Sequence, residues 1–533
     1  MKIIARNGNV RINKFPGMAE LSKKIALTRA ILSMKQIFHD EYRFYPLSWF
    51  IPTHQSKISW FIVKPDDGSQ GTGIYLINNP DQLKDTNSRQ LVQAYIDHPY
   101  LMNDGLKFDF RIYAVIKSIN PLSIYVAREG MARFCTEKYN KPTLSSNLYA
   151  HLTNYSLNKA NESYIHSNSL YDQLKGSKRL LSTVFHQLEA KGVKTKRLWH
   201  NIKLIIVKTI IAMVPEIMLN YEHCFSDSSG AQCFQIMGFD ILLTEELEPV
   251  LLEVNSAPSL TIDHCVAEAD ENTDCQEPRA RSIVDETIKI PLVRDTLLLV
   301  LDLMDRVYGS TYSKFVFPGR YGLAVGHLLF LDKAAYLFMQ FVNLKHNMLI
   351  TITGLRNFIR KCNLMDVIDA NYLQAKYSEI LNEFNGEDKL HNECGLPFHG
   401  FLKLLYYIAQ LKFFNYINLF QQVNNLLTYC CSSLRHYGVR SARLRRIEID
   451  DNDKENLVKI YLLPIRLQQK RLGRLDARLR SEIEAKRARQ RYARSLPRDL
   501  KGFPTNKNGN FPGKSFRNNR KELILPKIRQ TFH

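Results

Sequence analysis

Short apolar and alternating runs, separated by Gly, Pro and Asn, fill residues 60–259 of this 533-residue chain. Such runs are typical of β-strands, and a helix-compatible stretch at residues 171–219 lies among them. Apolar stripes with helical spacing occur before this segment, at residues 18–39, and after it, at residues 282–307. Helical periodicity then continues over residues 323–429. The pattern predicts an α+β fold followed by a helical C-terminal region.

These changes in the pattern of apolar and polar residues divide the chain into five expected units. A chain of 533 residues exceeds what one hydrophobic core usually supports, so several domains are expected. The basic region carries Leu472, Leu475, Leu479 and Ile483 at steps of three and four, which predicts an amphipathic helix. The expected units are an N-terminal subdomain at 1–59, an α+β core at 60–310 with an exposed acidic loop at 263–281, a helical domain at 311–433, a basic helical region at 434–500 and a disordered basic tail at 501–533.

Positive charge is concentrated near the C-terminal end. Residues 434–533 carry 27 Lys and Arg against 10 Asp and Glu, so they hold +17 of the net charge of +21. Such a surface attracts polyanions, whether nucleic acid, acidic lipid or acidic protein. Residues 466–494 contain a single aromatic residue, Tyr492, which leaves little for base stacking. Nucleic acid is therefore the disfavoured partner.

The sequence shows no sign of export or membrane insertion. Its first 15 residues lack an apolar signal-peptide core. The most apolar stretch, residues 202–219, is interrupted by Lys203, Lys208 and Glu216, so it is too short to span a bilayer. The nine cysteines are scattered without CxxC pairs. We expect a soluble protein with reduced thiols.

Residues 60–77, WFIVKPDDGSQGTGIYLI, read as two strands around a glycine-rich bend. Gly68, Gly71 and Gly73 would let the backbone approach a phosphate closely, and Lys64 would add positive charge. The bend is not a Walker loop, because GxxxxGK[ST] is missing and a strand follows it. Taken alone, the segment fits an ordinary β-hairpin better than a phosphate site.

The run KFDFRIY alternates charged and apolar residues without a break. A strand would place Lys107, Asp109 and Arg111 on one face and the apolar residues on the other. A solvated strand face with paired ions fits the same alternation. Arg133 and the run HLTNYS at residues 151–156 supply further polar groups in apolar surroundings.

The strongest chemical signal comes from the runs FDILL and VLLEVN on either side of the turn TEELEP. If Leu243 pairs with Val250, Asp240 lies directly opposite Glu253, with the side chains about 5 Å apart. Like charges in this position repel, so a divalent cation between them would explain the pair, and Asn255 would add a neutral oxygen. Mg²⁺, held together with nucleotide phosphates, is the predicted occupant. A shared proton or a different strand register are the alternatives.

Other metal sites are not predicted. His223, Cys224 and Cys233 lack the spacing of a zinc site. Residues 366–372 lack the acidic periodicity of a calcium loop.

Taken together and in this order, several motifs resemble the tubulin tyrosine ligase-like family of ATP-grasp ligases. They are Lys64 with the glycine bend, QAYI at residues 93–96, KFDFRIY, HLTNYS and the Asp240 and EVN pair. The resemblance covers about residues 11–307, and LVQAYIDHPYLMNDGLKFDFRIYAVI and EGMARFCTEKY are most similar to the polyglutamylase branch. It implies an ATP-grasp core, an α-helical C-terminal domain and a basic tail. The N-terminal subdomain would be abbreviated, because family members normally carry further strands there.

The resemblance also implies an activity. Such an enzyme uses ATP and Mg²⁺ to add glutamate to the γ-carboxyl of glutamates in tubulin C-terminal tails, through an acyl phosphate. Its partners would be free glutamate and tubulin or microtubules, the latter bound by the basic region at residues 434–500, and it would act as a monomer without a membrane. It would reside in the cytoplasm on the cytoskeleton, with the cilium or basal body as further sites. The alternatives are a microtubule-binding protein with an inactive ligase domain, or a tubulin glycylase.

Carried over by position, the resemblance assigns roles to three groups of residues. Arg111, Arg133 and Glu253 would be catalytic, and Asp240, Glu253 and Asn255 would hold Mg²⁺. The nucleotide would be bound by Lys64, Gln70, Gly71, Gln93, Ala94, Tyr95, Ile96, Lys107, Asp109, Thr153 and Asn154.

Overall fold

The structure is a computed structural model that describes most of the first 436 residues and one later strand. By its internal contacts the chain divides into residues 1–465 and 466–533, and every described residue belongs to the first unit. Within the described part, no helix is both long and apolar enough to cross a membrane. The described residues are 10–49, 60–66, 68, 71–84, 89–119, 122–144, 147–167, 174–225, 232–265, 279–303, 322–342, 348–385, 395–436 and 458–462.

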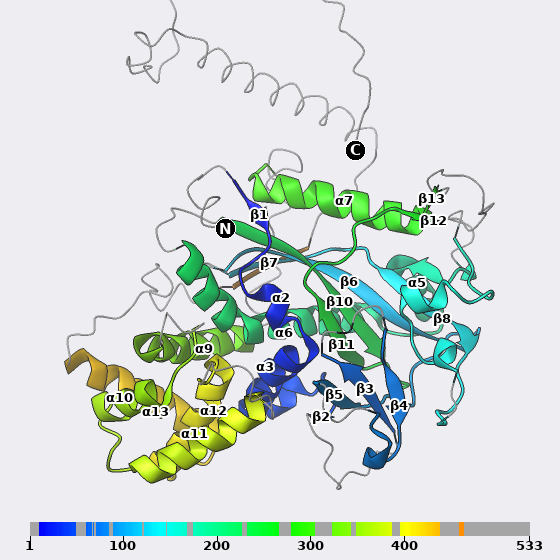
Figure 1. Cartoon of the computed structure of the whole chain (residues 1–533). Helices are drawn as coiled ribbons and strands as arrows, with labels where there is room; N and C mark the ends of the chain where they lie inside the picture. Colours follow the sequence, from blue (N-terminus) through cyan, green and yellow to red (C-terminus); the bar gives the residue numbers. More distant parts are fainter. Residues whose placement is uncertain are drawn as a thin grey trace, which may run out of the picture. The chain divides into compact units, whose positions relative to one another are not determined.

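A mixed eight-stranded sheet lies at the centre of the fold (Figure 1). Its two longest strands, β6 and β10, pair antiparallel, and β10 also pairs antiparallel with β11. On the other side of β6 lie β7 and β8, while β1 and β14 join the sheet in parallel. The strands are β1 (Ile12–Asn13), β6 (Leu106–Ile119), β7 (Leu122–Val126), β8 (Met131–Lys138), β9 (Lys178–Leu180), β10 (Cys233–Leu243), β11 (Pro249–Asn255) and β14 (Val458–Leu462).

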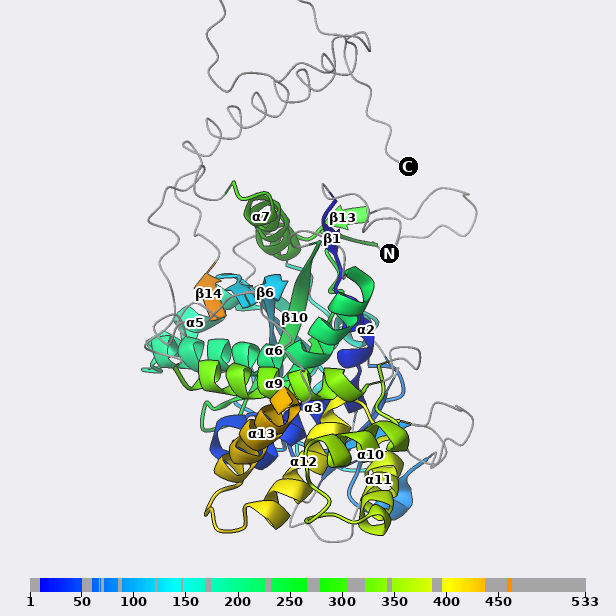
Figure 2. The same cartoon turned by 90° about the vertical axis from the view of Figure 1, so that its left-hand side faces the viewer.

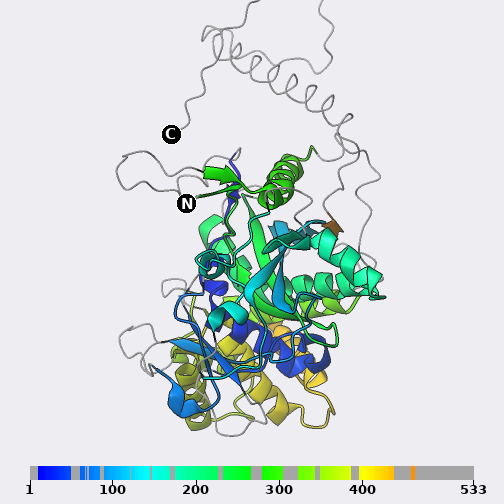
Figure 3. The ribbon, with the colours of Figure 1, turned by 90° about the vertical axis from the view of Figure 1, so that its right-hand side faces the viewer.

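Helices cover the two faces of this sheet differently (Figures 2 and 3). The 31-residue helix α6 (Thr195–Phe225) packs against the face that carries Phe108 and Phe110. Helix α7 (Ile283–Val300) packs against the opposite face, where Tyr113 lies. The predicted two-faced strand is therefore confirmed. Because successive side chains alternate, the charged residues at the start of β6 lie on the α7 face, beyond the reach of the α6 core.

A second sheet contains four strands in the order β2-β5-β3-β4. The predicted hairpin is confirmed: β3 (Phe61–Pro65) and β4 (Tyr75–Ile77) pair antiparallel on either side of the glycine bend. Gly71 and Gly73 have φ values of 86° and 72°, which other residues rarely adopt. The remaining strands are β2 (Ser48–Trp49) and β5 (Gln90–Ala94).

The predicted helical periodicity of residues 323–429 is confirmed in the described part of that range. Helix α9 runs along α6, and α12 packs on both α13 and the N-terminal helix α3 (Figure 2). The helices are α2 (Met18–Leu21), α3 (Lys24–Ile37), α4 (Tyr155–Asn158), α5 (Leu181–Ala190), α9 (Gly322–Phe341), α10 (Ile352–Lys361), α11 (Ala370–Asn385), α12 (Phe398–Lys412) and α13 (Leu419–His436), with 3₁₀ turns at His39–Tyr42, Pro80–Gln82 and Leu148–Ala150.

Three expectations about secondary structure were wrong in part. The single helix expected at residues 18–39 is divided at Lys23, whose extended backbone (ψ 149°) lets α3 start afresh. Residues 178–180, within the helix-compatible stretch, form strand β9 because they pair with β8. Strand β14 lies in the region expected to be helical, where pairing with β7 satisfies its backbone.

The expected acidic loop at residues 263–281 begins and ends as a short hairpin. Strands β12 (Asp263–Cys265) and β13 (Arg279–Arg281) pair antiparallel and bring the two ends together. The amphipathic helix expected from residue 466 onward and the tail at 501–533 lie outside the described residues.

Candidate active site

A cleft is lined by residues of both sheets. Strands β3 and β5 supply one wall, and β6, β8, β10 and β11 supply the other. The segment at residues 151–154 closes one side. The structure thus brings together residues that are far apart in the sequence. The predicted site residues that line the cleft are Lys64, Gln93, Ala94, Tyr95, Ile96, Lys107, Asp109, Arg133, Thr153, Asn154, Asp240 and Glu253.

The other predicted site residues lie beside the cleft lining. Arg111 donates hydrogen bonds to Asp240 from the neighbouring strand. Gly71 approaches the Asn154 side chain so closely that an added Cβ would lie 3.3 Å from it. Asn255 Nδ2 donates to Glu253 Oε1 over 3.4 Å. Gln70 lies outside the described residues.

Several cleft residues were missed by sequence reasoning. Ile62 stands two residues before Lys64, so the period of a strand could have indicated it. His151 begins the run HLTNYS, and its Nδ1 lies 2.8 Å from Tyr95 Oη. Burial lowers the pKa of His151 to about 4, so the ring is neutral at pH 7. The remaining missed lining residues are apolar or small and carry no local signal: Pro46, Ile74, Leu152, Leu242 and Leu252.

Two buried lysines face the cleft without a carboxylate partner. Lys64 Nζ donates to Gln93 Oε1 over 2.7 Å, and Lys107 Nζ donates to Tyr95 Oη over 2.8 Å. Among the described residues, neither ammonium has a carboxylate within 4 Å. Burial lowers the pKa of both lysines to about 8. Because a buried ammonium is costly without a counter-charge, these two lysines, one on each wall, make the cleft suited to binding an anion.

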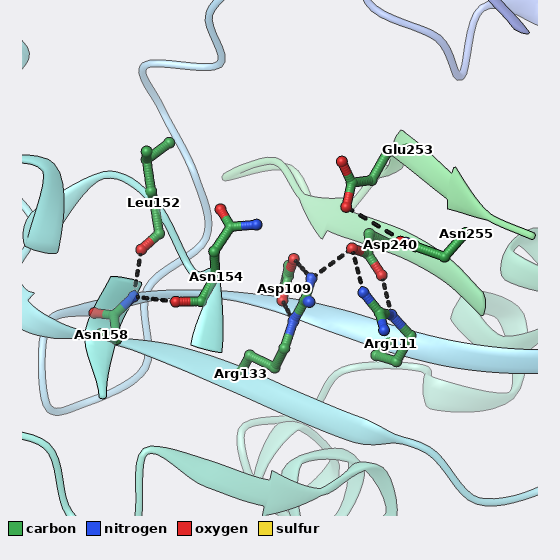
Figure 4. A network of polar contacts seen from close by, with 9 residues as sticks. All are labelled: Asp109, Arg111, Arg133, Leu152, Asn154, Asn158, Asp240, Glu253 and Asn255. Atoms are coloured by element: carbon green, nitrogen blue, oxygen red, sulfur yellow. Dashed lines mark hydrogen bonds and ion pairs between the residues drawn. The ribbon is translucent and has the colours of Figure 1, made fainter. Parts of the chain in front are cut away.

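On the wall that also carries Lys107, arginines and aspartates form a buried network (Figure 4). Arg111 Nη2 donates to Asp240 Oδ2 over 2.8 Å, and its Nε donates to Oδ1 of the same carboxylate. Arg133 bridges two acids: its Nη2 lies 2.7 Å from Asp240 Oδ2, and its Nε lies 2.9 Å from Asp109 Oδ1. Both aspartates are only 1% exposed. The strand register produces the network, because Arg111 lies opposite Asp240 and Arg133 lies opposite Asp109.

The network sets the ionisation of Asp240. Burial alone would raise the pKa of Asp240. The guanidinium groups of Arg111 and Arg133, and the hydrogen bond from Arg111, outweigh burial and lower this pKa well below its ordinary value. Asp240 is therefore an anion at neutral pH, with its charge already balanced.

The predicted opposition of Asp240 and Glu253 is confirmed, although the register assumed for it was wrong. Leu243 pairs with Pro249 instead of Val250. A β-bulge next to Asp240 then absorbs one residue and restores the pairing of Asp240 with Glu253. Burial, and then the neighbouring Asp240 charge, raise the pKa of Glu253. The pair thus has the repulsion that the sequence indicated.

Asp240, Glu253 and Asn255 form the predicted set of oxygen donors for a metal ion. The described residues contain no group of three or more His, Cys, Asp and Glu side chains that could hold a metal. The predicted set has two carboxylates and the amide of Asn255, which are the oxygen ligands that Mg²⁺ accepts alongside substrate phosphates. Glu253 forms no ion pair with a described residue, and its raised pKa indicates a need for positive charge. These residues fit Mg²⁺.

A second, smaller pocket lies next to the network, and its lining includes Tyr155 and Lys178. Lys178 of β9 pairs directly opposite Arg133, so both side chains lie on the same face of the sheet. Lys178 Nζ lies 3.9 Å from the centre of the Tyr155 ring and 2.9 Å from Asp285 Oδ2. Lys289 also contacts Asp285, over 2.7 Å. Sequence reasoning missed Lys178, because only the pairing of β9 with β8 brings it here.

A cleft between two sheets, with a glycine bend and a buried lysine on one wall and a second buried lysine with paired carboxylates on the other, is the arrangement of an ATP-dependent ligase of the ATP-grasp type. The chain belongs to the tubulin-tyrosine ligase family, whose model matches residues 2–271. A second family model, described as "Tubulin polyglutamylase TTLL11, EF-hand", matches residues 314–452.

Similar proteins support this assignment along most of the chain. The chain is 58% identical over 510 residues to "Tubulin polyglutamylase ttll-11" of Caenorhabditis elegans, an alignment that covers 89% of this chain and 72% of the relative. It is 36% identical over 478 residues to "Tubulin polyglutamylase TTLL11" of Homo sapiens, covering 79% and 66%. It is 40% identical over 270 residues to "Tubulin polyglutamylase TTLL13" of Homo sapiens, covering 48% and 32%.

Proposed function

We propose that this chain is an ATP-dependent tubulin polyglutamylase, which joins glutamate to the γ-carboxyl of glutamates in tubulin C-terminal tails. The observation that carries the proposal is the pairing of two buried, uncompensated lysines with an arginine–carboxylate network in one cleft. The printed names of the relatives supply the acceptor and the amino acid.

The chemistry requires that a carboxylate become a good electrophile. A γ-carboxylate oxygen of the tail attacks the terminal phosphorus of ATP, ADP leaves, and an acyl phosphate forms. The amino group of the incoming glutamate then attacks the acyl carbon, loses a proton, and inorganic phosphate leaves as the amide bond forms. Lys64 and Lys107 would bind the nucleotide phosphates, and Arg111 and Arg133 would neutralise charge that develops on the transferred group.

Asp240, Glu253 and Asn255 would hold Mg²⁺ at the edge of the same cleft. The bound ion would neutralise phosphate charge and orient the terminal phosphate. The protein's own part is to keep Asp240 ionised through Arg111 and Arg133 and to place Glu253 opposite it.

The pocket around Lys178 is suited to the free amino acid. Lys178, which lies opposite Arg133, contacts Tyr155 and is paired with Asp285, would also bind a carboxylate of glutamate. The choice of glutamate over glycine as the amino acid that is added rests on the printed names of the relatives.

The proposal extends to the setting of the enzyme. The basic segment at residues 434–533 would bind the anionic surface of microtubules and raise the local concentration of enzyme near the tails. We further propose that the protein acts as a monomer in the cytoplasm on the cytoskeleton, including the cilium or basal body.

One experiment tests activity and amino-acid choice together. The full chain is incubated with microtubules, ATP and radiolabelled glutamate, glycine or tyrosine in parallel. Only glutamate should be incorporated, it should require ATP, and subtilisin, which removes tubulin tails, should release it. Incorporation of glycine would instead identify a glycylase. Microtubule binding without any incorporation would identify an inactive ligase domain.

A further inference from the structure

Helix α3 connects the glycine bend to the C-terminal helices. Its 14 residues, Lys24–Ile37, contact a different part of the protein at each end. At the N-terminal end, Lys24 Nζ donates to the carbonyl of Gly68, and the amide of Ile25 donates to Asp66 Oδ1 over 2.9 Å. Asp66 is only 8% exposed. The bend that follows β3 is therefore attached to the start of α3.

Near its other end, α3 is held by helix α12. Ser33 Oγ lies 2.7 Å from His399 Nδ1, and Tyr406 Oη donates to the carbonyl of Ser33 over 3.0 Å. The second ring nitrogen of His399, Nε2, lies 3.1 Å from the carbonyl of Ala212 in α6. Since a carbonyl only accepts, Nε2 carries the proton and Nδ1 is the acceptor that faces the Ser33 hydroxyl, which also lies within donating distance (2.9 Å) of the carbonyl of Ala30. His399 thus joins α3, α6 and α12.

Helix α12, which holds α3, belongs to a set of two helix–loop–helix pairs, α9 with α10 and α11 with α12. The two connecting loops are joined by a short antiparallel bridge, in which Ile350 and Leu396 each donate an amide hydrogen bond to the other's carbonyl over 2.9 Å. This is the arrangement of paired EF-hands, in agreement with the family model that matches this region. The segment at residues 366–372, which lacks the acidic periodicity of a calcium loop, connects the two helix–loop–helix pairs.

Neither loop has the ligands for calcium. Met348 has a φ of 62°, which identifies it as the sixth loop position, where calcium-binding loops place Gly for a sharp turn. The twelfth position, which should be a bidentate Glu, is then Gly354. Counting from the bridge residue in the same way, the twelfth position of the second loop is Gly400. Both loops therefore lack the bidentate carboxylate of a calcium site.

We propose that this EF-hand pair acts as a calcium-independent support that positions the glycine bend through α3, with His399 as the positioning residue. Ser33 lies nine positions after Lys24, so the two attachments lie about 13.5 Å apart along a rigid helix. If α3 loses its attachment to α12, Gly68 and Asp66 can shift with it. A displacement of about 1 Å at a reacting group can cost about 100-fold in rate. This inference depends on the proposed function at one point, namely that the glycine bend binds ATP.

The test uses the full chain and measures ATP affinity by calorimetry, together with thermal unfolding. His399→Phe removes both hydrogen bonds while filling the site, and we expect ATP binding about tenfold weaker. Ser33→Ala removes the hydrogen bond to His399 from the α3 side, and it should also weaken ATP binding. His399→Gln, which can still donate and accept, should recover most of the affinity. Adding calcium or a calcium chelator should change none of these values.

The matched control is Leu355→Ala on α10, a helix that packs on α9 and α11. It should lower the unfolding temperature and leave ATP affinity within about twofold. An equal loss of affinity in this control, or unchanged affinity in both His399→Phe and Ser33→Ala, would overturn the inference, as would a calcium effect on ATP binding. Hydrogen exchange of residues 60–77, measured without nucleotide, separates the positioning role of His399 from the proposal that the glycine bend binds ATP. Faster exchange in His399→Phe supports the positioning role even if ATP fails to bind.

Discussion

Replacing Glu253 by Gln should make the protein more stable and inactive at the same time. The change removes one of two opposed carboxylates and leaves the shape of the side chain intact. Two unit charges about 5 Å apart repel by about 3 kcal/mol at an effective dielectric constant of about 20. The arginines that lower the pKa of Asp240 also attract Glu253, so we expect a net gain of roughly 1–2 kcal/mol.

The gain in stability from Glu253→Gln should increase with pH. The folded state raises the pKa of Glu253, so between the unfolded and folded pKa values the native protein binds more protons than the unfolded chain. Its stability therefore falls as pH rises through this window. Gln has no proton to release. The free energy of unfolding of the variant should therefore exceed that of the wild type at pH 8, and the difference between the two should shrink towards zero near pH 4.

Urea unfolding without divalent cations, at pH 5 and pH 8, measures this difference, and the tubulin assay measures activity. We expect transfer to fall by at least about 100-fold, the typical loss for an electrostatic group at a reacting centre. Glu248→Gln makes the same chemical change in the exposed turn before β11 and should alter neither quantity. A variant less stable than wild type at pH 8 would show that the arginines hold Glu253 as an anion. Undiminished transfer would remove Glu253 from the reaction.

Three other predictions follow from the site and the charge pattern. Because burial lowers the pKa of Lys64 and Lys107 to about 8, ATP affinity measured by calorimetry should weaken as pH rises above about 8; a flat profile to pH 10 would contradict this. Lys178→Met should raise the KM for glutamate about tenfold or more and leave the KM for ATP nearly unchanged, and equal effects on both would exclude a dedicated amino-acid pocket. Removing residues from Arg466 onward should weaken microtubule pelleting and its salt dependence, whereas unchanged pelleting would exclude the tether.

Local sequence determined the strands and the residue types of the site. Alternation in KFDFRIY specified which face of β6 is charged, since side chains of a strand alternate whatever surrounds it. Strand alternation on either side of a short turn likewise predicted that Asp240 lies opposite Glu253. The helices of the C-terminal region also followed from periodicity. Their EF-hand pairing did not, because loops without calcium ligands such as Gly354 lack the acidic signature.

Tertiary structure decided what no local pattern records. Lys178 joins the site only because β9 pairs with β8, and the bulge beside Asp240 corrects a register that the turn alone misplaced. His399 contacts Ser33 across 366 residues of sequence. Such contacts depend on how whole elements pack, and the free energy that selects one packing is shared among many buried residues. A short stretch of chain specifies its own periodicity, but its distant neighbours are chosen by the entire core.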